Sequence, residues 1–246
     1  MSCYEALAPV YDSMTRNVDY ARRCAVLHEI LQQNSIQGIV LDAGCGTGTL
    51  ALLLAEKGYD MIGVDGSDAM LNEAYAKSVG RTADVRWLCQ DLRALDLFGT
   101  VRAVVCMQDT VNHIPRGDLE TVFSRFSLFT EPVGLLLFDY NTEHKHRDVL
   151  ADNCFVIEDA RGLCVWQNRL DASARLVHLT VDVFVREGKL YRRSTDRFAE
   201  YTYADAELDE TLSRCGYRVL ERRDGDDYGP VRRDSERILV CARKEH

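Results

Sequence analysis

The chain has 246 residues, of which 46% are hydrophobic and 28% are charged. These values are typical of one large globular domain, or of one domain with a modest insertion, and they exclude disordered, collagen-like and coiled-coil proteins. The 39 acidic residues outnumber the 30 basic ones, and the resulting net charge of −9 disfavours nucleic acid as a partner. No apolar run approaches the ~20 residues of a membrane helix, so we expect no membrane partner.

The nine cysteines form no C-x-x-C pair, and Cys89, Cys106 and Cys241 lie within apolar, strand-like runs. This pattern predicts small buried side chains in a reducing compartment, so we expect a cytoplasmic protein without disulfides. His144 and His146 have no supporting ligand spacing and favour a solvated loop. We therefore expect no metal site.

Short apolar strands alternate with helices over the first 145 residues. We expect helices at 4–14, 19–33, 49–57, 67–79 and 119–129, and strands at 38–42, 60–65, 85–89, 103–107 and 133–140. Such alternation predicts βαβ units and an α/β fold with a doubly wound, Rossmann-like sheet. The strands are apolar throughout, which is typical of parallel strands buried on both faces.

The pattern changes to period-2 alternation after residue 150. The segments 154–159, 163–171, 175–186 and 189–203 show this alternation, and three or four antiparallel strands of a small accessory β sheet are expected there. A helix at 205–215 and a strand pair at 217–223 and 236–243 then return to the main sheet. The predicted organisation is one domain formed by residues 1–149 and 204–246, with residues 150–203 inserted.

Three features mark the carboxyl ends of successive strands. A glycine-rich loop at 44–48 leads from the first strand into a helix, which lets a ligand lie against main-chain atoms. Asp65 ends the second strand and is placed to accept both ribose hydroxyls of an adenosine. At the end of the third strand, the Asp91 carboxylate can accept from an adenine amino group, and Leu92 offers an N–H. Parallel strand ends share one edge, so these residues predict one crevice.

The glycine spacing discriminates between cofactors. A dinucleotide fingerprint, G-x-G-x-x-G, would need glycine where Thr49 stands, whereas the loop reads G-x-G-x-G. A sulfonium amino acid needs an acidic entrance, which Asp42 supplies beside the loop. A nicotinamide oxidoreductase is therefore disfavoured, and a non-catalytic module that binds a sulfonium nucleoside remains an alternative.

Three segments resemble motifs of the class I S-adenosylmethionine-dependent methyltransferases. VLDAGCGTGTL (40–50) resembles motif I, VDGSDAML (64–71) the second motif, and LCQDLRAL (88–95) the adenine-binding motif. The resemblance covers about residues 36–145 and 205–243. It implies a seven-stranded sheet whose last strand is antiparallel, with S-adenosylmethionine as cofactor and S-adenosylhomocysteine as product.

A narrower resemblance lies in YEALAPVYDSMTRNVDY (4–20), which is similar to the N-terminus of a small bacterial subgroup. In that subgroup, which resembles sugar-amine N-methyltransferases and glycine N-methyltransferase in architecture, helices cover the cofactor and an antiparallel sheet follows strand five. The sequence departs from the subgroup at Gly66 and Gln108. The motifs and this resemblance together give the expected cofactor-binding residues, which are Tyr11, Tyr20, Asp42, Gly44, Cys45, Gly46, Thr47, Gly48, Asp65, Gly66, Met70, Gln90, Asp91, Leu92 and Gln108.

The expected reaction is in-line methyl transfer to an unidentified small-molecule acceptor, with RNA or protein as alternative acceptors. The catalytic candidates are Gln108, Asp109, His113 and Tyr11, although the sequence favours a loop histidine bonded to backbone over a general base at His113. Residues 150–203 are expected to form a lid that contacts the acceptor through Trp166 or arginines, or else a dimer interface. The sequence leaves monomer and homodimer open.

Overall fold

The computed structural model describes residues 4–82, 84–159 and 162–245. The strands of the main sheet are ordered β10-β11-β5-β4-β1-β2-β3. Their bounds are β1 (Ile39–Ala43), β2 (Asp60–Asp65), β3 (Val85–Cys89), β4 (Val101–Cys106), β5 (Thr130–Asn141), β10 (Tyr217–Asp224) and β11 (Arg237–Lys244). Strands β1 to β5 are parallel, and β11 runs antiparallel to both of its neighbours. The predicted seven-stranded Rossmann-like sheet with an antiparallel last strand is confirmed.

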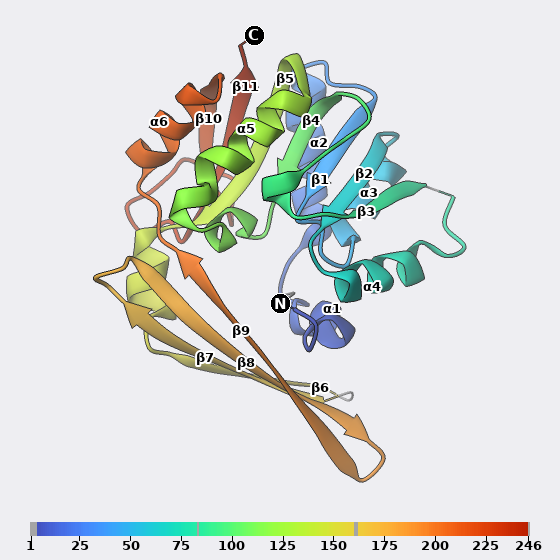
Figure 1. The fold of residues 1–246 in the computed structure, drawn as a ribbon, viewed down its shortest axis with the longest axis vertical. Coiled ribbons are helices and arrows are strands. Elements are labelled where there is room, and N and C mark those ends of the chain that lie inside the picture. The colour runs from blue at the N-terminus through green and yellow to red at the C-terminus, as the bar shows by residue number, and fades with distance from the viewer. Residues whose placement is uncertain (1–3, 83, 160–161, 246) are drawn as a thin grey trace.

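Helices cover both faces of this sheet, as the alternation predicted (Figure 1). One face buries apolar side chains of α2 (Tyr20–Gln33), α3 (Thr49–Glu56) and α4 (Asp68–Ser78), including Leu27, Leu52 and Leu71. The other buries those of α5 (Leu119–Phe129) and α6 (Asp205–Arg214), including Phe123 and Leu212. Because apolar side chains cover both faces of the sheet, its strand ends are where polar side chains of the sheet can meet solvent or a ligand.

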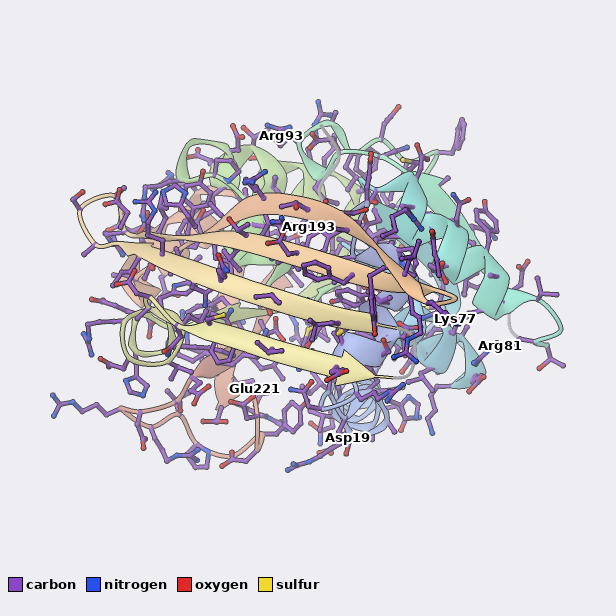
Figure 2. The ribbon with its side chains drawn as sticks, turned by 90° about the horizontal axis from the view of Figure 1, so that it is seen from below. Asp19, Lys77, Arg81, Arg93, Arg193 and Glu221 are labelled. Carbon is purple, nitrogen blue, oxygen red and sulfur yellow. The ribbon has the colours of Figure 1, made fainter. Side chains whose placement is uncertain are left out.

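The four-stranded antiparallel sheet follows β5, as expected. It consists of β6 (Cys154–Asp159), β7 (Gly162–Asp171), β8 (Leu176–Glu187) and β9 (Leu190–Tyr201). Figure 1 places it beyond the carboxyl ends of the parallel strands, and Figure 2 shows its strands in front of the main domain in the view from below. The small sheet therefore covers the edge at which the sequence predicts a crevice.

The arginines of the segment 186–197 are engaged within the small sheet. Arg192 is ion-paired with Glu187 at 2.7 Å, and Arg193, which Figure 2 labels, is ion-paired with Asp182 at 2.9 Å. Both arginine side chains remain more than half exposed, as is usual for charges on a solvated strand face. Within the part of the chain that the structure describes, no helix is long and apolar enough to cross a membrane.

The N-terminal segment differs from the single helix expected at 4–14. It begins with turns, continues as a 3-10 helix, η1 (Ala8–Val10), and ends in one α-helical turn, α1 (Tyr11–Met14). Tyr4 has a positive φ of 71°, and Pro9 lies at the start of η1, which interrupts a continuous helix. Apolar side chains of this segment pack against Cys164, Val181 and Val183 of the small sheet, so tertiary packing overrides the helical pattern.

Five short helical turns complete the fold. They are η1, already described, η2 (Leu92–Ala94), η3 (Thr110–His113), η4 (Arg116–Asp118) and the π-helical η5 (Lys145–Leu150). The sequence pattern did not predict η5, which joins β5 to the small sheet. Within it His146 is only 1% exposed and bonds Glu200 and Thr202, so the solvated loop expected there is wrong for this histidine.

Candidate active site

A cavity of about 510 Å³ opens at the carboxyl ends of β1 to β4. Among the residues that line it are eleven singled out from the sequence: Tyr11, Gly44, Gly46, Asp65, Gly66, Met70, Gln90, Asp91, Leu92, Gln108 and His113. A smaller pocket of about 30 Å³ shares Tyr11, Gly44, Gly46 and Gln108 with it and adds Tyr20, Asp42, Cys45 and Thr47. The structure thus brings most of the expected site residues to one crevice.

Two of the expected residues line neither pocket. Gly48 has a φ of +75°, and a Cβ there would lie 2.3 Å from the Trp87 ring, so glycine at this position serves close packing of helix and sheet. Asp109 lies beneath the crevice wall, where it pairs with Arg237. Gly46, in contrast, has no atom within 4 Å of its Cβ direction, and it faces open space in the crevice.

Asp65 is held at the end of β2 by two backbone groups. The N–H of Gly46 donates to Oδ2 at 2.8 Å, and the N–H of Ser67 donates to Oδ1 at 2.9 Å. Burial raises the pKa of Asp65, and these N–H groups counteract that rise. Each oxygen keeps a further lone pair, so the carboxylate can accept two more hydrogen bonds from the cavity.

Asp42 is a buried carboxyl group at the floor of the smaller pocket. Its residue is 2% exposed, and its Oδ2 atom has no hydrogen-bond partner among the described residues. Burial, together with the charge of Asp65, raises the pKa of Asp42 to about 7. A buried carboxyl in this state favours a ligand that brings positive charge or hydrogen-bond donors.

Asp91 faces the cavity but is already engaged. The Arg93 guanidinium contacts both carboxylate oxygens, with Nε 2.9 Å from Oδ1 and Nη2 2.5 Å from Oδ2, and this contact lowers the pKa of Asp91. Arg93 also reaches Asp118 at 3.1 Å. Both side chains of the Asp91–Arg93 pair are about half exposed, so this pair can rearrange around a ligand.

The N-terminal segment is fastened over the glycine loop. Asp12 of α1 accepts from the Thr47 hydroxyl at 2.6 Å and from Lys77 of α4 at 2.8 Å. This anchor places the neighbouring Tyr11 at the wall between the two pockets. Burial, and then the nearby Tyr20 hydroxyl, raise the pKa of Tyr11, so it remains a neutral hydroxyl at physiological pH.

A buried network of charges supports the end of β4. Gln108 and Asp109 both have positive φ values, 59° and 53°, a strained conformation for two residues that are not glycine. The Asp109 N–H donates to Asp139 Oδ1 at 2.7 Å, and Arg237 bridges Asp109 at 2.6 Å and Asp139 at 3.1 Å. These contacts hold the strained turn in place.

The side-chain oxygen of Gln108 is fixed by a second buried arginine. Arg23 of α2 donates to Gln108 Oε1 and lies 3.6 Å from Asp139. Because the amide oxygen is occupied, the Gln108 NH₂ group is the part left to face the crevice. Arg23 and Arg237 are distant from this strand in sequence and follow no motif, so sequence reasoning missed them.

His113 forms the wall of the cavity opposite the glycine loop. Its Nε2 atom lies 3.0 Å from the Tyr4 hydroxyl and 3.6 Å from Asp109 Oδ2. Asp109, His113 and Glu200 place their ligand-type atoms within 4.8 Å of one another, as a metal site would. Asp109 is, however, already ion-paired with Arg237, and the positive charge of Arg237 opposes binding of a metal cation there. Tyr4 and Glu200 were not predicted.

The small sheet reaches the cavity only indirectly. Among the described residues, none of β6 to β9 lines it; instead Phe198 stacks on Tyr4, with ring centroids 4.8 Å apart. Trp166, expected at the acceptor, packs in the apolar cluster beneath the N-terminal segment, and its Nε1 donates to Asn168 at 2.7 Å. Trp166 therefore packs in the core of the small sheet and does not line the cavity.

Comparisons with known proteins agree with this geometry. Residues 40–134 match a family described as a methyltransferase domain. The chain is 31% identical to the Bacillus subtilis protein YqeM, described as a methyltransferase, over 98% of this chain and 97% of that protein. A crystal structure of an S-adenosylmethionine-dependent methyltransferase from Clostridium acetobutylicum superposes with a TM-score of 0.89, at 28% identity and with 99% of each chain covered. Rat glycine N-methyltransferase is 28% identical over 58% of this chain and 51% of its own length.

Proposed function

Since the chain belongs to the class I S-adenosylmethionine-dependent methyltransferases, we propose that the cofactor spans the two pockets and that the acceptor is a small molecule. S-Adenosylmethionine supplies a methyl group whose bond to sulfur breaks as the acceptor attacks in line, the electron pair staying on sulfur to give S-adenosylhomocysteine. The protein's task is therefore to bind the cofactor and align the acceptor.

The residues present fit this cofactor. The free lone pairs of Asp65 suit the two ribose hydroxyls, and Asp91 with the Leu92 N–H suits the adenine edge. The unpartnered Asp42 oxygen suits the cationic methionine end in the smaller pocket. We assign Gly44 and Gly46 to the close approach of that ligand, because both have positive φ and line the pockets, and a Cβ on Gly46 would project into open space.

The acceptor proposal rests on one observation: the cavity lined by the cofactor residues continues to Tyr4, Gln108 and His113 beneath a cover. The cover is the N-terminal segment, fixed by Asp12 and backed by the small sheet. A volume of about 510 Å³ suits one nucleoside-sized ligand and a small acceptor. An RNA or protein acceptor would need a broad open surface at this edge.

An amine nitrogen is the acceptor atom that fits best. The chain is 28% identical to glycine N-methyltransferase over 58% of its length, and the Asp65 carboxylate, which lines the cavity, attracts an ammonium group. We further propose that residues 150–203 act as the acceptor lid by positioning Tyr4, with residues 1–149 and 204–246 forming the cofactor-binding domain.

Methyl incorporation from labelled S-adenosylmethionine tests this proposal. The purified chain would be incubated with a panel of small amines (glycine, 2-aminoethanol and glucosamine), with transfer RNA, or with a mixture of unfolded proteins. We expect label in the small amines alone. Label that is found instead in the RNA or protein fraction would contradict the small-molecule proposal, and an Asp65→Ala control would show whether incorporation uses this crevice.

A further inference from the structure

The surroundings of the His113 ring leave its Nε2 atom as the nitrogen that can take up a proton. About a fifth of this side chain is accessible, and it lines the cavity at the end of η3. Nε2 faces the Tyr4 hydroxyl at 3.0 Å and Asp109 at 3.6 Å, while the backbone carbonyl of Ala199 also bonds the ring. Because Nε2 is turned to Tyr4 and Asp109, we assign the contact with Ala199 to Nδ1.

This arrangement selects one tautomer of the neutral ring. A carbonyl oxygen only accepts hydrogen bonds, so Nδ1 keeps its proton beside Ala199. The lone pair of the neutral ring is then on Nε2, where the Tyr4 hydroxyl donates to it. Phe198 packs edge-on against the ring at 5.3 Å, which fixes its plane. His113 therefore presents a proton acceptor toward the cavity.

Charged groups from several elements face this ring. Asp109 approaches from its own loop, Glu200 from β9 and Asp65 from β2, while Arg237 of β11 lies behind Asp109. Burial by itself lowers the pKa of His113, but Asp109, which accepts from the ring once Nε2 is protonated, and the charge of Glu200 raise it above its ordinary value. These carboxylates stabilise the imidazolium that forms when Nε2 takes a proton.

We propose that His113 is the general base of methyl transfer, that Asp109 positions its ring, and that the Tyr4 hydroxyl connects Nε2 to the acceptor. The inference rests on the proposed function, because an amine enters the site as an ammonium ion and must lose a proton before it attacks. One proton passes from the nitrogen to the Tyr4 oxygen as the Tyr4 proton moves to Nε2. The nitrogen lone pair is then free to form the new bond to carbon, and the imidazolium returns its proton to solvent.

Nitrogen NMR of the histidine rings tests the base without any acceptor. The full chain with bound S-adenosylhomocysteine would be titrated from pH 5 to 9, and His113 assigned by comparison with His113→Gln. We expect a neutral ring protonated on Nδ1 and a midpoint above 6.5. A neutral ring protonated on Nε2, or a ring that does not titrate in this range, would overturn the proposal.

Kinetics with the amine of the panel that is methylated fastest supply the second test. We expect kcat/KM of the unaltered protein to rise with pH and level off once His113 is neutral. His113→Gln should lose roughly 10²–10⁴-fold and show no such plateau, while affinity for S-adenosylhomocysteine stays within threefold. Tyr4→Phe, which keeps the ring stack on Phe198, should lose at least tenfold. His28→Gln is the matched control, because His28 bonds Tyr59 away from the cavity.

The outcomes separate this inference from the proposed function. If the unaltered protein methylates the amine and His113→Gln matches it in rate and pH profile, His113 is not the base, while the small-molecule proposal stands. If only RNA or protein is methylated, the proposed function fails, and the NMR titration still decides the state of His113. Should His113→Gln not fold, two measurements still test whether His113 is the base. One is the NMR titration, with His113 assigned by exclusion of the other histidines, and the other is the activity of the folded Tyr4→Phe variant.

Discussion

Replacing Asp42 by asparagine should stabilise the ligand-free protein and weaken its binding of the cofactor. The size of the effect on stability follows from the environment of the Asp42 carboxyl. Asp42 is 2% exposed, with one oxygen unpartnered, and its pKa is raised from an ordinary 3.8 to about 7 by burial and then by Asp65. The folded state therefore prefers the protonated carboxyl. The stabilising contribution of the protonated Asp42 carboxyl is fully present below pH 3.8. It is lost as the pH rises toward 7, and it is absent above pH 7.

The magnitude comes from the difference between the two pKa values. A difference of roughly 3 units at 1.36 kcal/mol each gives a penalty of about 4 kcal/mol at pH 8. At pH 5 the same relation gives a penalty of ~2 kcal/mol, because the unfolded carboxyl is already ionised there. Asparagine does not titrate, so the stability advantage of Asp42→Asn should grow by roughly 2–3 kcal/mol between pH 5 and pH 8.

Urea unfolding of both ligand-free proteins at a series of pH values measures this difference. The same variant should bind S-adenosylmethionine more weakly than the unaltered protein at pH 8, because the cationic end of the cofactor loses its counter-charge. A pH-independent difference in unfolding free energy would refute the raised pKa of Asp42. Unchanged affinity at pH 8 would refute its contact with the cofactor.

Calorimetry and unfolding test the remaining assignments. Asp65→Ala should weaken S-adenosylhomocysteine binding by roughly 10–150-fold, since two charged hydrogen bonds to ribose are lost; a change below threefold in calorimetry would contradict the ribose contact. Gly46→Ala should fold and fail to bind S-adenosylhomocysteine, whereas Gly48→Ala should lose stability because its Cβ clashes with Trp87. Equal urea midpoints for the two variants would contradict the assignment of Gly46 to ligand binding and of Gly48 to packing. Arg93→Ala frees the Asp91 carboxylate and should leave affinity equal or tighter, with a stability change within ~1 kcal/mol; weaker binding in the same titration would show that Arg93 itself holds the ligand.

The sequence was most informative where a single physical rule governs each residue. Buried parallel strands must be apolar along their whole length, so β1 to β5 could be recognised without tertiary information. Glycines with positive φ, such as Gly44 and Gly46, mark a sharp turn beside a ligand, and Asp65 follows at a spacing set by the βαβ unit. The residues that line the crevice at the ends of β1 to β3 were predictable for this reason.

The wall that we propose for the acceptor was not predictable, because segments distant in the sequence form it. Tyr4, Arg23, Glu200 and Arg237 meet His113 or the β4 turn only after the N-terminus, the small sheet and the last strand have docked. No local spacing encodes such contacts. The N-terminal helix at 4–14 failed for the same reason, since its apolar residues follow the surface of the small sheet rather than a helical period.

A crystal structure of the chain with S-adenosylhomocysteine bound would show whether the cofactor occupies this crevice. We expect ribose hydroxyls within ~3 Å of both Asp65 oxygens, the amino acid end beside Asp42, and the sulfur directed toward the cavity wall formed by Gln108 and His113. A ligand found elsewhere on the molecule, or one bound here with its sulfur directed away from that wall, would contradict the proposed cofactor site.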